Sequence, residues 1–185
     1  MCGAVIAACR MPDSGRRDGS GDANLVELED LRVGSVYGVG SGFESGALRF
    51  AVDAFGPELG NVEVVDAAAA RPKAAARKSD DKETPRAGGL RLSHAKLDVS
   101  GAKFQRLEFA YTDRGGPVAI RFAGVERGAE DLIELDGCEL DGVKLSVEES
   151  STAGVRSGRV VATGRIQRFS LCGADLEVAK LRVGD

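Results

Sequence analysis

The second half of the chain alternates apolar and polar side chains with a period of two residues, and this pattern constrains the fold class. Residues 107–111 read Leu-Glu-Phe-Ala-Tyr, and 118–122 and 176–178 alternate in the same way. Because successive side chains of a strand point to opposite faces, the pattern predicts half-buried antiparallel strands. Asp-Gly steps at 136 and 141 mark turns between them, and from residue 90 onward no run of ten residues has helical periodicity. We therefore expect an all-β chain built as an antiparallel β-sandwich or jellyroll.

Composition divides the chain into four segments. Residues 1–23 form a signal-like and tether segment, and 24–65 contain strand-like pieces over 28–39 and 47–52 that we assign to the β-domain. Residues 66–89 hold no aliphatic side chain larger than Ala. Since such a stretch cannot bury enough apolar surface to offset its ordering entropy, it is predicted to be a linker or a disordered or loop insertion. The main β-domain then covers 90–185.

Charge and residue usage exclude several classes of protein. The chain has 25 Lys and Arg against 29 Asp and Glu, and its basic residues are scattered along the sequence. A general nucleic-acid binder needs a basic stripe, so we expect no nucleic-acid partner. One His and no Trp in 185 residues leave little for imidazole-based catalysis or metal binding. We expect no cofactor.

The N-terminus carries the most specific local motif. Val5 to Cys9 reads Val-Ile-Ala-Ala-Cys and resembles the lipobox of bacterial lipoproteins. The resemblance implies that Cys9 is acylated, that the protein is anchored to a membrane, and that it resides in the periplasm or cell envelope. The Gly-, Ser- and Asp-rich residues 11–23 fit a flexible tether. A signal peptide also needs a basic start and a longer apolar run, so this prediction requires a longer natural start. The alternative is an apolar N-terminus of no special meaning.

Candidate catalytic groups are few. Cys138 and Cys172 are expected to be small buried hydrophobic residues, with a disulfide as the alternative in an oxidising compartment. Ser93 and His94 are neighbours on a predicted strand, so their side chains point to opposite faces, and His94 is expected at the surface. Acidic pairs such as Glu148-Glu149 lie near turns and are expected to be solvated. No catalytic or metal-ligating residue is predicted.

Two further resemblances concern the β-domain. Small-x-large units recur five residues apart near 133–145, which resembles pentapeptide-repeat proteins. A solenoid needs more consecutive units than the three present, so we interpret them as short strand ends around a tight Asp-Gly turn. The stretches 140–146, 158–164 and 172–178 resemble the β-jellyroll proteins of lipopolysaccharide export and AsmA-like envelope proteins. That resemblance implies an open β-groove lined by aliphatic side chains and Phe that holds acyl chains. The alternative is an ordinary sandwich with a filled core.

Two functional hypotheses follow, and neither is an enzyme. The first is an envelope binding or scaffold protein that holds a hydrophobic ligand in its groove or binds an envelope component. The second is a structural or assembly protein, such as a virion or appendage part, whose β-domain makes protein–protein contacts. A groove open to solvent would favour the first, whereas a filled core with an apolar surface patch would favour the second.

Overall fold

The computed structural model describes residues 24–25, 28, 31–66, 87–152 and 154–184, and these fold almost entirely as β-strands. The elements in chain order are β1 Asn24–Leu25, β2 Val36–Gly38, β3 Gly42–Ser45, β4 Leu48–Ala54, β5 Asn61–Asp66, β6 Ala87–Asp113, β7 Val118–Phe122, β8 Val125–Ala129, the short 3-10 helix η3 Leu132–Leu135, β9 Glu139–Leu140, β10 Val143–Thr152 and β11 Val155–Gly184. The strands form one 11-stranded antiparallel sheet. The prediction of an all-β antiparallel chain is confirmed.

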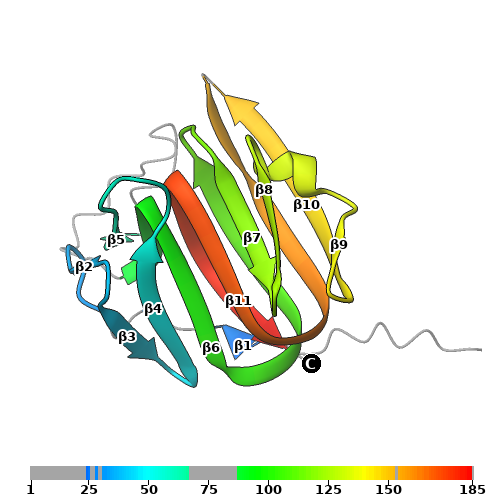
Figure 1. Ribbon diagram of the computed structural model, residues 1–185, viewed down its shortest axis with the longest axis horizontal. Coiled ribbons are helices and arrows are strands. Elements are labelled where there is room, and N and C mark those ends of the chain that lie inside the picture. The colour runs from blue at the N-terminus through cyan, green and yellow to red at the C-terminus, as the bar shows by residue number, and fades with distance from the viewer. Residues whose placement is uncertain (1–23, 26–27, 29–30, 67–86, 153, 185) are drawn as a thin grey trace, which may run out of the picture.

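Two long strands organise the sheet. β6 and β11 are 27 and 30 residues long, and they pair with each other along most of their length. Leu176 of β11 faces both Leu92 and Asp113 of β6, at opposite ends of that strand. The end of β11 therefore lies between two parts of β6, and the sheet curls over itself to form the two layers of the sandwich. Figure 1 shows β2 to β5 on one side of this pair and β7 to β10 on the other.

The remaining strands extend the layers outward. β4 pairs with β6 at residues 95–100, and β7 pairs with β11 at residues 169–173. β5 joins the start of β6, and β10 joins the start of β11. Within the described residues β1, β2, β3, β8 and β9 each pair with a single neighbour and are therefore sheet edges.

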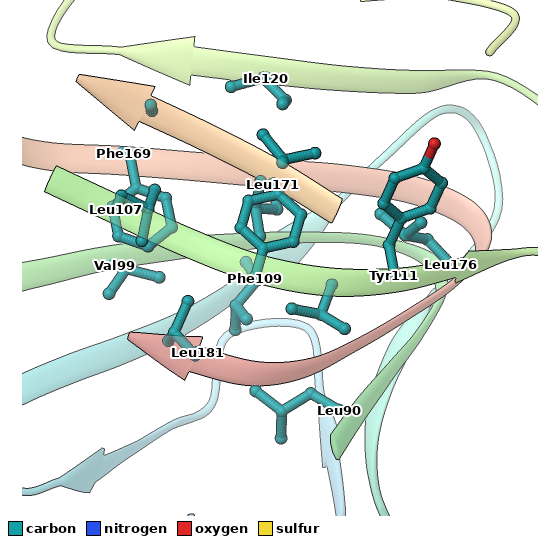
Figure 2. Packing of buried hydrophobic residues seen from close by; sticks show 14 of the residues in the cluster. Leu90, Val99, Leu107, Phe109, Tyr111, Ile120, Phe169, Leu171, Leu176 and Leu181 are labelled. Carbon is teal, nitrogen blue, oxygen red and sulfur yellow. The ribbon is translucent and has the colours of Figure 1, made fainter. Parts of the chain in front are cut away.

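One hydrophobic core lies between the layers. Leu107, Phe109 and Tyr111 of β6 are each at most 3% exposed, and they point toward side chains of β7 and β11 (Figure 2). The predicted alternation holds at residues 107–111. At residues 176–178 it is wrong, because Glu177 is also buried, at 6% exposure. This segment of β11 is flanked by β6 on both sides, and the Glu177 carboxylate accepts a hydrogen bond of 2.9 Å from Arg114 Nη2.

Some predicted boundaries need correction. Of the described residues in the strand expected over 28–39, only Val36–Gly38 form a strand, and Gly34 with φ of 83° is part of a turn before it. The strand expected over 47–52 is β4. Of the predicted linker 66–89, Asp66 belongs to β5 and Ala87 to β6, while 67–86 lie outside the described residues.

The five-residue spacing near 133–145 arises from a hairpin. Leu140 of β9 pairs with Val143 of β10, so the loop between them is only Asp141 and Gly142. Their φ values of 50° and 75° are those of a type I′ turn, the form that matches the twist of paired strands. The interpretation as strand ends around a tight Asp-Gly turn is confirmed for residues 138–145, whereas the first unit, 133–135, belongs to the 3-10 helix η3.

Candidate functional site

The predicted acylation site Cys9 and its tether, residues 1–23, lie outside the described residues. Among the residues that the structure describes, no helix is long and apolar enough to cross a membrane.

The two cysteines of the β-domain are both unpaired thiols. Cys172 is 1% exposed and lies between Lys96 of β6 and Ala119 of β7 in the strand register. Burial raises the pKa of this thiol to about 12, so it stays protonated and unreactive at neutral pH. Cys138 is half-buried against the core. The prediction of buried hydrophobic residues is confirmed for Cys172, and the disulfide alternative is wrong for both.

The single histidine lies at the surface, as predicted. The side chain of His94 is 44% exposed, and its Nε2 atom lies 3.2 Å from Glu58 Oε2. Its φ of 47° marks an irregularity in β6, since side chains rarely adopt this backbone conformation. Across the ladder Ser93 faces Asp175.

A buried polar pair crosses β6 and β11 on the face opposite the core. The Ser170 hydroxyl donates a hydrogen bond to Asp98, its direct partner in the ladder. Lys96 Nζ and Arg168 Nη2 each lie 3.4 Å from Asp98 Oδ2. Burial alone would raise the pKa of Asp98, but the hydroxyl and the two cations outweigh it and hold the pKa below its usual value.

A second charged group lies where β6 ends. Arg91 donates two hydrogen bonds to Asp175, of 3.1 and 3.2 Å, and this pairing raises the pKa of the guanidinium. Arg114 Nη2 donates to Glu177 Oε2 at 2.9 Å. Next to them, Arg156 Nε lies 3.5 Å from Oδ2 of Asp113, a residue only 1% exposed. These contacts link both ends of β6, near Arg91 and Asp113, to β11.

A third group surrounds Glu108 on the outer face of β6. Arg159 Nη2 lies 2.6 Å from this carboxylate, and Arg106 and Arg182 approach it to 3.3 and 3.9 Å. The hydrogen bond from Arg159 lowers the pKa of Glu108 against the opposing effect of burial. The Glu108 carboxylate thus lies within 4 Å of the guanidinium groups of three arginines, one on β6 and two on β11.

These three groups consist of ion pairs that link neighbouring strands, as in a structural role. The buried carboxylates Asp98, Asp113 and Glu177 each lie within 4 Å of a Lys or Arg nitrogen, so their charges are compensated. In the described part of the chain, no three His, Cys, Asp or Glu side chains gather as a metal site would require.

An apolar patch lies beside the free edge of β2. Val36, Val39 and Leu59 are 60%, 41% and 91% exposed, and we call them the β2 edge patch. Gly38 of β2 pairs with Asn61, so Val39 follows this pair by one residue and Leu59 precedes it by two. Three aromatic rings lie in a row from β2 to the buried core. The ring centroids of Tyr37 and Phe43 are 4.4 Å apart, and the ring of Phe43 stacks on that of the buried Phe50 with a centroid distance of 4.6 Å.

Sequence reasoning did not identify these surfaces, although parts of them are visible in the sequence. Arg106 and Glu108 alternate with core residues, which indicates an outer face, but Arg159 and Arg182 reach that face only through the pairing of distant strands. Leu59 lies two residues after Pro57, outside any alternating or helical pattern of apolar residues. An isolated apolar residue in such a loop could have been recognised as a candidate for surface exposure.

Comparison of the chain with protein-family models, with curated proteins and with solved structures finds no match in any of the three.

Proposed function

We propose that the protein is a non-enzymatic scaffold or assembly protein whose β-domain binds another polypeptide along the free edge of β2. The observation that carries this proposal is the β2 edge patch, in which Val36, Val39 and Leu59 expose apolar side chains beside a strand that pairs, among the described residues, with β5 alone. Exposed apolar surface at a sheet edge is typical of recognition by strand addition.

The sequences of the edge strands β8, β9 and β2 differ in a way that favours β2. Proteins usually block free edges with charged residues or proline, which discourage pairing with another chain. β8 carries Glu126 and Arg127, and β9 begins with Glu139. β2 reads Val-Tyr-Gly and has no charge and no proline. Backbone hydrogen bonds along β2 would supply affinity, and the exposed aliphatic side chains would supply selectivity.

The core favours protein contacts over an acyl ligand. Its largest side chains, among them Phe109, Phe122 and Phe169, are less than 2% exposed and pack on one another. A ligand groove would instead present such side chains to solvent. The compensated carboxylates described above likewise favour a binding role over acid–base catalysis.

Location in the cell envelope is part of the proposal and rests on the lipobox-like residues that end at Cys9. Multiple acylation anchors a protein stably, whereas a single chain binds only marginally. Expressed from its natural start, the protein should fractionate with membranes, and Cys9→Ser should release it. Mass spectrometry that finds an unmodified Cys9 on the full-length product would remove the envelope location and leave the binding edge unaffected.

The binding edge is tested by site-directed crosslinking. A photoreactive amino acid is placed at Leu59 in one strain of the source organism and at the exposed Glu139 of β9 in a control strain. We expect one polypeptide segment to be crosslinked from position 59 and not from position 139. A synthetic peptide of that segment should then bind the purified protein and slow hydrogen exchange at Val36 to Gly38. Leu59→Ser should weaken this binding. Equal crosslinking from both positions, or protection elsewhere in the sheet, would refute the assignment.

A further inference from the structure

The structure collects basic side chains at one end of the molecule, where β6 and β11 bend. In the ladder, Arg49 faces Ser100 and Ser100 faces Arg168. In the next part of the sheet Lys144 faces Thr163, which faces Arg106. We call the set at this end the basic end: Arg49, Lys103, Arg106, Lys144, Arg165 and Arg168.

The basic end has an excess of positive charge although the whole chain has a net charge of −4. Five carboxylates lie at this end. Glu44, Glu108 and Asp98 pair with Arg49, Arg106 and Arg168 at 3.0, 3.3 and 3.4 Å, and Glu139 and Asp141 belong to the β9–β10 hairpin. Six basic residues against five acidic ones leave one positive charge, and the three arginines that already have a carboxylate partner contribute none of it. Among the described residues, Lys103, Lys144 and Arg165 are exposed and make no ion pair, so they are available to an anionic partner.

The entry point of the chain lies at the same end. Asn24 of β1 pairs with Val183, and the next residue of β11, Gly184, pairs with Arg106. Figure 1 shows β1 beside the bends of β6 and β11. Residues 10–23 join Cys9 to Asn24, and a chain of that length spans at most about 50 Å. An anchor at Cys9 would therefore keep the domain near a bilayer and would be attached to it at the same end as these basic side chains.

We propose that the basic end docks on the surface of a membrane that contains anionic phospholipids. The lysines and arginines would lie among the lipid phosphates, where each basic residue contributes attraction that falls off within about 10 Å at moderate salt. The docking would orient the domain with the end that holds Asp113, Glu149 and Asp175 away from the membrane. This inference does not depend on the β2 edge patch, which lies on a different part of the sheet.

Vesicle binding of the full chain tests the proposal. The Cys9→Ser protein, which cannot be acylated there, is mixed with vesicles of phosphatidylcholine containing about 30% phosphatidylglycerol or with phosphatidylcholine alone. We expect co-sedimentation with the anionic vesicles only, and its loss when salt is raised from about 0.05 to 0.5 M. The same binding to both vesicle types would overturn the proposal, as would no binding to either.

Two matched triple variants test whether vesicle binding depends on the basic end or only on the number of positive charges in the protein. Lys103→Gln, Lys144→Gln and Arg165→Gln together should lower vesicle partitioning by about a hundredfold, from the usual contribution of a basic residue near an anionic surface. Arg32→Gln, Arg127→Gln and Lys180→Gln remove the same charge from exposed positions elsewhere and should retain most of the binding. Equal loss in both variants would refute the assignment to this end. Thermal unfolding of both proteins verifies their folding, and peptide binding at β2 should be unchanged in the first variant.

Discussion

The hydroxyl of Tyr111 on β6 donates a hydrogen bond of 2.7 Å to Glu149 Oε2 on β10, across the intervening strand β11. The ring can reach this far because Gly158 of β11 faces both residues and has no side chain. A Cβ at Gly158 would lie 2.9 Å from the Tyr111 ring and 2.0 Å from the Glu148 carbonyl oxygen. The aromatic ring thus covers a glycine in the middle strand, an arrangement that stabilises sheets.

Tyr111→Phe is expected to lower the free energy of unfolding by about 1 kcal/mol at pH 7, because the ring packing stays and the hydrogen bond to a carboxylate is lost. Burial and Glu149 raise the pKa of Tyr111 above its ordinary value of 10.0. The phenol therefore contributes its full stability below about pH 10 and loses it above that pH. Denaturant unfolding of both proteins at pH 8 and above pH 10 should show the difference between them shrinking. A difference that does not change with pH would contradict the role of the phenol.

The contacts of Asp98 with Ser170, Lys96 and Arg168 predict that the folded protein loses stability in acid. Asp98→Asn should lower the free energy of unfolding by about 2 kcal/mol at pH 7, because Lys96 and Arg168 lose their shared counter-charge. Since the folded-state pKa of Asp98 lies below its ordinary value of 3.8, its contribution is present above about pH 4 and is lost as the pH falls further. The two proteins should therefore converge in stability toward pH 2 to 3.

Two variants control this experiment. Ser170→Ala removes only the hydroxyl that donates to Asp98, so the pKa of Asp98 measured by carboxyl NMR titration should rise. Glu139→Gln changes an exposed carboxylate on β9 and should leave stability unchanged. An Asp98→Asn protein as stable as the parent at pH 7 would show that the ion pairs contribute no net stability.

Local patterns in the sequence predicted the strands better than their assembly. The alternation at 107–111 and the Asp-Gly turn at 141 depend only on near neighbours, and both were correct. The burial of Glu177 depends on β11 returning between two parts of β6, more than 60 residues away in sequence. No period in the sequence specifies such pairing. The basic end was missed for the same reason, because Arg49 and Arg168 come to lie on either side of Ser100 only through long-range register.

The conformation of the β9–β10 turn predicts that replacing Gly142 by Ala costs stability, whereas the same replacement at Gly128 does not. Gly142 has φ of 75° and open space around its Cα, so Gly142→Ala should cost about 1 kcal/mol through backbone strain alone. Asp141→Asn should be neutral or slightly stabilising, because Asn tolerates the left-handed region well. Gly128→Ala in the exposed β8 serves as the control and should not destabilise the protein, since its Cβ would make only an ordinary contact of 3.7 Å. Chemical denaturation of the three variants gives the comparison, and an unchanged Gly142→Ala protein would contradict the turn assignment.

The last prediction concerns the insertion between β5 and β6. Asp66 and Ala87 are direct partners in the ladder, so the chain leaves and re-enters the sheet at adjacent positions. Residues 67–86 are rich in Ala and charge and hold no large aliphatic side chain. Replacing them with an Asn-Gly turn should therefore preserve the β-sheet circular dichroism spectrum and cooperative unfolding. In the parent protein, limited trypsin digestion should cut after Arg77, Lys78 or Lys82 before it cuts after Lys144 or Arg168. Failure of the shortened chain to fold would show that the insertion contributes to the core, and early cleavage at Lys144 would show that the β9–β10 region is the less stable element.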